Sequence, residues 1–228
     1  MRHGWSVVHK KGGVMRYGLG SIQKVDDDVL LFAKQLGATD IIVHTPEDLG
    51  TDGYYEYMPM LQLRQRVEEA GLTLYAIENV HWDWVRDVQL GRPGRDRQIE
   101  NYQKTIRNMG KAGIGVLGYN WMPNSVWRTS NTKPTRGDAK VTAFDYNLVK
   151  DAPLSFEREY SDEDMWSNYE YFIHAVAPIA DEVGVRLALH PDDPPMPSLG
   201  GVARLFRNHD GYRRMLKVAP YESVSLEF

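Results

Sequence analysis

Cysteine is absent from the 228 residues of this sequence. Its absence excludes disulfide bridges and any thiolate metal site within these residues. No apolar run approaches the roughly 20 residues that a transmembrane helix needs. The N-terminus also lacks the continuous apolar stretch of a signal peptide. We therefore expect a cytoplasmic protein with no membrane partner.

An excess of basic residues is absent too: 27 lysines and arginines face 31 aspartates and glutamates, which gives a net charge of −4. Nucleic-acid-binding proteins normally carry a basic face, so no nucleic-acid partner is expected. No G-x-G-x-x-G or Walker motif follows the first expected strand, which disfavours a nucleotide-binding fold. What is present, 42% hydrophobic and 25% charged residues, is typical of one globular domain.

Short apolar strands alternate with amphipathic helices along the chain. The pattern predicts strands at residues 14–20, 40–44, 72–78, 114–119, 185–190 and 223–228. Between them it predicts helices at 26–37, 97–112, 161–183 and 201–216, and one more that ends at residue 71. This repeat is typical of a parallel sheet, either doubly wound or closed into a (β/α)8 barrel. Residues 120–160 are expected to form a long irregular loop, and such loops are often functional.

Polar and ionisable residues stand at or just after the ends of several predicted strands. They are His44, Glu78, His81, Asn120, His190 and Asp192. In a TIM barrel the active site is built at this face from several strands, which favours the barrel. About six strands are visible where a barrel has eight, and the sequence stops within the sixth. We therefore predict an α/β protein, a (β/α)8 TIM barrel truncated after about six strands.

The sharpest local signal runs from His190 to Pro195, with the sequence His-Pro-Asp-Asp-Pro-Pro. A histidine at a strand end is held by the sheet with its ring directed into the barrel mouth. Two carboxylates follow within reach, which suits an imidazole metal ligand supported by Asp192. The alternative is a solvated Asp-Pro turn after a strand, and the residues alone leave both interpretations open.

Four stretches resemble the mannonate dehydratase family, in collinear order from about Met15 to Phe228: Ala76–Val80, Arg95–Gly110, Gly118–Thr129 and His190–Pro195. The resemblance implies a xylose isomerase-like TIM barrel and a divalent cation, Mn²⁺ or Fe²⁺. The implied enzyme is a metal-dependent hydro-lyase that dehydrates D-mannonate to 2-keto-3-deoxygluconate. That reaction belongs to hexuronate (glucuronate) catabolism.

The resemblance also assigns roles to residues. His190 matches the first metal-ligand histidine of the family. The family's next ligand is a cysteine directly after a strand like residues 225–228, so it would follow Phe228. Its later histidine and aspartate ligands and its catalytic residues would also lie beyond that point. The catalytic residues therefore remain unknown within this sequence, and the activity of this stretch alone is an open question.

Substrate contacts are expected from residues near the strand ends. Glu78 could contact a substrate hydroxyl or act in proton transfer, and a structural pairing with a nearby arginine is the alternative. Asn120 and Arg128 could hold hydroxyls and the carboxylate, since arginine binds carboxylates through two parallel hydrogen bonds. His81 could line the sugar pocket, and Asp192 is a further candidate.

Several alternatives remain at this stage. His44 also ends a strand, but a hydrogen-bonded structural histidine is the favoured interpretation. The family pattern begins at Met15, so residues 1–14 are expected to be a non-native or mis-started extension, and residues 15–228 an incomplete TIM-barrel catalytic domain. Other functions are a sugar isomerase or epimerase of the same superfamily, or a degenerate non-catalytic fragment. A homo-oligomer is expected, and a dimer is the favoured form.

Overall fold

A computed structural model describes residues 15–227 of the chain, so the expectation for residues 1–14 lies outside the described residues. Its centre is a sheet of six strands in the order β1-β2-β3-β4-β7-β10, and every neighbouring pair is parallel. The strands are β1 (Gly18–Ile22), β2 (Asp40–His44), β3 (Thr73–Glu78), β4 (Val116–Tyr119), β7 (Arg186–Leu189) and β10 (Val224–Leu226). The predicted parallel α/β architecture with six strands is confirmed.

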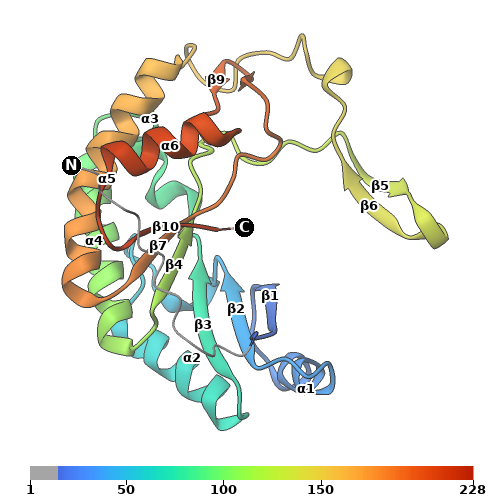
Figure 1. The fold of residues 1–228 in the computed structure, drawn as a ribbon, viewed down its shortest axis with the longest axis vertical. Helices are drawn as coiled ribbons and strands as arrows, with labels where there is room; N and C mark the ends of the chain where they lie inside the picture. The colour runs from blue at the N-terminus through green and yellow to red at the C-terminus, as the bar shows by residue number, and fades with distance from the viewer. Residues whose placement is uncertain (1–14, 228) are drawn as a thin grey trace, which may run out of the picture.

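Helices cover the outer side of this curved sheet, and the strands line its inner side (Figure 1). The helices are α1 (Asp27–Gln35), α2 (Tyr57–Glu69), α3 (Arg86–Leu90), α4 (Arg95–Ala112), α5 (Asp162–Val183) and α6 (His209–Val218). Short 3-10 turns lie at Glu47–Leu49, Trp82–Trp84, Arg136–Asp138 and Tyr146–Leu148. No helix within residues 15–227 is both long enough and apolar enough to span a membrane.

The longest helices form where the sequence provides both an apolar face and end signals. α4 buries Ile99, Tyr102, Ile106 and Met109, one face at helical spacing, and ends at Gly113 in the left-handed conformation. α5 begins at Ser161, whose hydroxyl accepts a hydrogen bond from the backbone N–H of Asp164. These two helices pack on each other, and α5 also contacts β7. The predicted helices are confirmed in both places.

Two predicted segments differ from the structure. The helix expected at residues 201–216 is shorter, because Gly200 and Gly201 adopt positive φ and form the turn of a small hairpin, β8 (Ser198–Leu199) and β9 (Val202–Ala203). Helix α6 then begins after Asn208, which caps it. The first strand lies at residues 18–22, four residues later than its predicted start. Helix α3 was not predicted at all.

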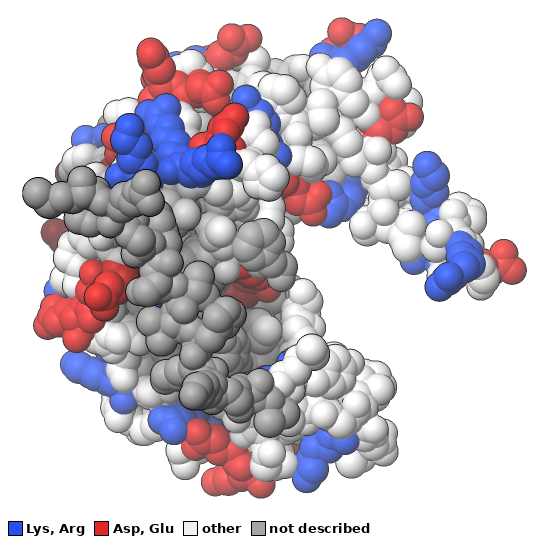
Figure 2. Space-filling model, viewed as in Figure 1, with Lys and Arg blue, Asp and Glu red and all other residues white. Residues whose placement is uncertain are grey.

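The segment 120–160, predicted as an irregular loop, contains an antiparallel hairpin that projects from the body (Figure 1). Its strands are β5 (Ser130–Pro134) and β6 (Lys140–Ala143). Residues 131–142 are all exposed, and Lys and Arg side chains gather at the far end (Figure 2). The prediction of irregular structure throughout was therefore wrong, because cross-strand backbone hydrogen bonds order this part without burying it.

Candidate metal centre

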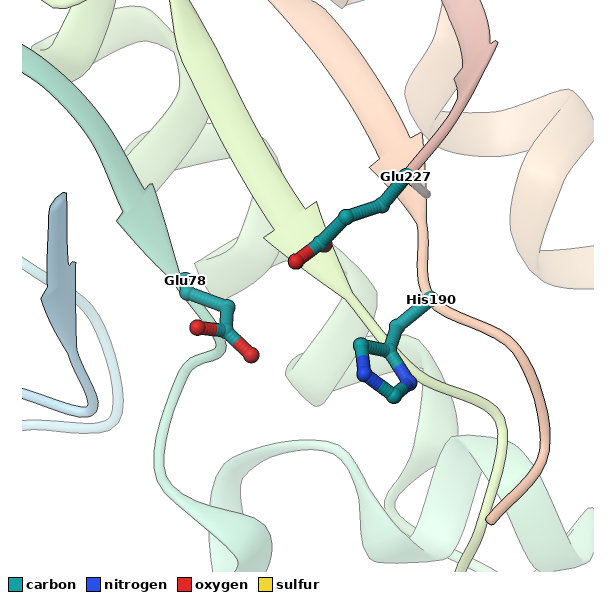
Figure 3. Close-up of side chains that lie close together, drawn as sticks. All are labelled: Glu78, His190 and Glu227. Atoms are coloured by element: carbon teal, nitrogen blue, oxygen red, sulfur yellow. The ribbon is translucent and has the colours of Figure 1, made fainter. Parts of the chain in front are cut away.

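Three strand ends bring two carboxylates and one imidazole together at one edge of the sheet. Glu78 is the last residue of β3, His190 follows β7, and Glu227 follows β10. One ligand atom from each residue lies within 4.8 Å of the other two, and all three residues are half-buried. Figure 3 shows the three side chains converging from separate strands. Because parallel strands present their carboxyl ends on the same face, residues far apart in sequence meet here.

Gly118 makes room for this cluster. It lies on β4, aligned with Glu78 on β3 and with Ala188 on β7. A Cβ atom at Gly118 would lie 3.0 Å from Oε2 of Glu227 and 3.0 Å from Cγ of Glu78, closer than ordinary van der Waals contact. The missing side chain therefore provides the space that the two carboxylates occupy.

The hydrogen bonds leave metal-ligating atoms free. Nδ1 of His190 lies 2.6 Å from the carbonyl oxygen of Pro191, which can only accept, so Nδ1 carries the proton and Nε2 keeps its lone pair. Oε2 of Glu227 is buried without a hydrogen-bond partner among the described residues. A buried carboxylate oxygen with no partner is costly unless a cation or donor approaches it.

Electrostatics point the same way. Burial raises the pKa of Glu227, the nearby charge of Glu78 raises it further, and His190 lowers it. Two carboxylates that share one site repel each other when both are ionised. A divalent cation between them removes this repulsion, and a set of two carboxylates and one imidazole suits Mn²⁺, Fe²⁺ or Zn²⁺. The residues present therefore fit a divalent metal ion.

The predicted site residues fall into two groups. Glu78 and His190 lie in the cluster. Asn120 follows β4, which lies between β3 and β7, and its Nδ2 donates to Oδ1 of Asn79 over 2.8 Å. His81 packs against the ring of Trp84 with centroids 4.6 Å apart. The structure brings the first two together and places the others around them.

Arg128 and Asp192 already have protein partners. Nη1 of Arg128 donates to Oδ1 of Asp193 over 2.9 Å, and Nη2 donates to the other oxygen of the same carboxylate. Asp192 is buried, and its Oδ2 accepts a hydrogen bond from the backbone N–H of Phe206 over 2.5 Å. Burial raises the pKa of Asp192 to about 6. A substrate role for either residue stays a prediction.

Two residues of this region were not singled out from the sequence. Glu227 lies near the end of the last predicted strand, as His190 does at the end of its own, and that position was the available signal. Asn79 follows Glu78 and adopts a left-handed backbone with φ of 63°, which asparagine tolerates better than most residues. His44, predicted as a hydrogen-bonded structural histidine, has its Nε2 3.2 Å from Nδ2 of Asn79, as expected.

Sequence comparison identifies relatives along nearly the whole chain. The profile of the family described as D-mannonate dehydratase (UxuA) matches residues 22–155 and 152–228. The chain is 32% identical over 213 residues to mannonate dehydratase 2 of Halalkalibacterium halodurans, covering 83% of this chain and 61% of the relative. It is 32% identical over 239 residues to the mannonate dehydratase of Thermotoga maritima, covering 89% of this chain and 65% of the relative. The chain thus spans about three fifths to two thirds of these relatives.

Structure comparison agrees. The crystal structure of mannonate dehydratase from Streptococcus suis serotype 2 matches with a TM-score of 0.77 and 34% identity over 93% of this chain and 61% of that one. A D-psicose 3-epimerase matches with a TM-score of 0.58 at 14% identity, which shows a shared fold alone. The family resemblance expected from the four sequence stretches is confirmed: this chain belongs to the D-mannonate dehydratase (UxuA) family.

Proposed function

We propose that the protein containing this chain is a metal-dependent hydro-lyase that removes water from D-mannonate to give 2-keto-3-deoxygluconate in hexuronate breakdown. The observation that supports this best is the cluster of Glu78, His190 and Glu227 over Gly118, in a chain of this family. The reaction takes a proton from the carbon next to the carboxylate and releases the neighbouring hydroxyl as water. It therefore needs charge stabilisation, a base and an acid.

In this proposal Glu78, His190 and Glu227 hold the cation, which is Mn²⁺ or Fe²⁺. When bound, a divalent cation supplies Lewis-acid stabilisation of the negative charge that develops on the substrate. The Pro191 carbonyl keeps the His190 ring in the tautomer that offers Nε2. Half-burial of all three side chains limits competition from water.

Substrate binding is proposed for Arg128 and Asn120. The guanidinium of Arg128 already holds one carboxylate, that of Asp193, through two hydrogen bonds. A sugar-acid carboxylate offers the same two oxygens and can replace Asp193 there. Asn120 is half-buried beside the β4 end and is proposed to contact a substrate hydroxyl. Glu78 is proposed for the metal in preference to its earlier expected role in proton transfer.

The experiment incubates the protein with Mn²⁺ or Fe²⁺ and D-mannonate, and it follows 2-keto-3-deoxygluconate together with any isomerised sugar acid. Metal-dependent formation of the keto acid supports the proposal. Glu78→Gln is expected to lower kcat/KM at least about 100-fold, because it removes a ligand charge. Glu182→Gln, on the exposed face of α5, is the matched control and is expected to change nothing.

Epimerised or isomerised product without loss of water would contradict the proposal and favour a sugar isomerase. Activity that survives Glu78→Gln and exhaustive chelation would contradict the metal assignment. The same assay thus separates the reaction type from the role of the metal.

A further inference from the structure

Beside the cluster, polar side chains at three neighbouring strand ends join in one hydrogen-bonded chain. His44 ends β2, Asn79 follows β3 and Asn120 follows β4. Asn120 contacts Asn79, and Asn79 contacts His44, over 2.8 and 3.2 Å. We infer that this row of hydrogen bonds has one direction only and makes Nε2 of His44 an acceptor, with the ring proton on Nδ1, so that Asn79 and Asn120 are positioning residues.

The direction follows from a backbone group at one end. The amide N–H of Met122 can only donate, and it lies 3.1 Å from the side chain of Asn120, so the atom that faces it is the oxygen Oδ1. The other side-chain atom of Asn120 is then the nitrogen, which donates to Oδ1 of Asn79. This leaves the nitrogen of Asn79 to face His44. An amide nitrogen only donates, so Nε2 of His44 accepts and carries no proton.

A second, longer contact favours the same orientation. Nδ2 of Asn79 also lies 3.5 Å from Oε1 of Glu78, and a carboxylate only accepts. The reversed amide would place its oxygen against that carboxylate. The backbone of Asn79 is held as well: its N–H donates to the carbonyl of Gly118 over 2.8 Å, and its carbonyl accepts from the Tyr55 hydroxyl over 3.1 Å.

The consequence concerns Glu78, and this step rests on the proposed metal site. Nε2 of His44 lies 3.8 Å from Oε1 of Glu78, within the range of an ion pair. Because Nε2 is occupied as an acceptor, it has no proton to offer to Glu78. His44 therefore places no donor on Oε1 of Glu78, which receives only the long contact of 3.5 Å from the Asn79 amide among these three side chains. A His44 that donated through Nε2 would compete with the metal for the same oxygen.

The substitution Asn120→Asp tests this row of hydrogen bonds without altering His44. The new carboxylate still accepts from the Met122 N–H, but its second oxygen now faces Asn79 and cannot donate. The Asn79 amide must rotate to donate to it, because the 2.8 Å contact with residue 120 outweighs the 3.5 Å contact with Glu78. The rotation turns Oδ1 of Asn79 toward His44 and requires a proton on Nε2. Asn147→Asp, at an exposed position in the turn that follows β6, is the matched control for the added charge.

The readout is the ¹⁵N–¹H spectrum of the histidine rings, with the His44 signals assigned by their loss in His44→Gln. We expect a proton on Nδ1 of His44 in the unaltered protein and in Asn147→Asp, and a proton on Nε2 in Asn120→Asp. A proton on Nε2 in the unaltered protein would overturn the inference, even if Asn120→Asp fails to fold. A folded Asn120→Asp with an unchanged His44 spectrum would overturn it as well.

Titration with Mn²⁺ alone tests the link to Glu78 separately. Asn120→Asp is expected to bind Mn²⁺ about 10-fold more weakly than the unaltered protein, a change typical of groups that orient metal ligands. An unchanged affinity in a variant with the reversed tautomer would overturn that link. No Mn²⁺ binding to the unaltered protein would overturn the proposed metal site and leave the tautomer result standing.

Discussion

At the residue scale, one glycine decides whether the acidic cluster can form. Gly118→Ala places a methyl group 3.0 Å from both Glu78 and Glu227, and one of its neighbours is the Cα atom of Glu78 at 3.3 Å, which cannot move away cheaply. We expect the variant to fold and to bind Mn²⁺ at least about 10-fold more weakly in a calorimetric titration. Gly115→Ala is the control, since a Cβ atom there meets nothing within 4 Å. Equal affinities for the two variants would mean that Gly118 has no part in the site.

Glu227 gives a second prediction at this scale. Its Oε2 is buried without a partner among the described residues, and its charge faces that of Glu78. Glu227→Gln removes this repulsion, so the metal-free variant is expected to melt higher by about 2–4 °C, the shift that about 1 kcal/mol produces in a chain of this size. Added Mn²⁺ is expected to stabilise the unaltered protein more than the variant. A metal-free variant that melts at a lower temperature would show that the charge of Glu227 does not destabilise the folded protein.

The site was only partly predictable from single residues. His190 and Glu78 were identifiable because each ends a predicted apolar strand. Glu227 lies one residue before the end of another, but the sequence does not reveal how close it comes to them. Nothing in the sequence distinguishes Gly118 from an ordinary small residue. The space that it leaves matters only because β3 and β7 flank β4.

At the element scale, the N-terminus of α5 is held by a capping box. The Ser161 hydroxyl accepts from the Asp164 N–H, and the Asp164 carboxylate accepts from the Ser161 N–H. Ser161→Ala is expected to lower the free energy of unfolding by about 1 kcal/mol, the usual loss for such a cap, in chemical denaturation. Ser167→Ala, on the exposed face of the same helix, is expected to cost nothing. Equal losses for both would argue against the cap.

The same helix end predicts a pH dependence. The hydrogen bond from Arg158, followed by that from the Ser161 backbone, holds the pKa of Asp164 below its ordinary value. A carboxylate with a lowered pKa stabilises the folded state above its unfolded pKa of about 4, and it loses that contribution as the pH falls through the folded pKa. Asp164→Asn is thus expected to be less stable than the unaltered protein at pH 7. The gap, measured by denaturant titration, closes as the pH falls below about 4; a gap that stays constant would contradict this cause.

Elements with strong local signals were predicted well, and those with weak signals were not. Strand β2 matches its predicted bounds, since its three apolar residues, Ile41 to Val43, lie between polar residues at both strand ends. Strand β9 lies within the predicted helix 201–216, and it forms a hairpin with β8 because Gly200 and Gly201 turn the chain. The arm β5–β6 has few apolar residues to reveal it.

At the scale of the whole molecule, strand order places the site. A (β/α) barrel has its strands side by side in chain order, so the predicted fold implies the order that the six strands adopt. In the structure β4 separates β3 from β7, and β10 adds to the far side of β7. This order brings residues 78, 190 and 227 to one edge of the sheet, although more than 100 positions of chain separate the first two. The distances between these three side chains depend on tertiary packing, and the sequence gives no local signal for them.

The most direct test of the account is a crystal of the protein grown with Mn²⁺ and measured for anomalous scattering. We predict one strong anomalous peak that lies within about 2.3 Å of a Glu78 oxygen, Nε2 of His190 and a Glu227 oxygen. Metal ions normally lie at about this distance from such ligands. The same map from Glu78→Gln is expected to show the peak weakened or absent. A fully occupied peak elsewhere, with no peak beside these three side chains, would contradict the proposed metal site.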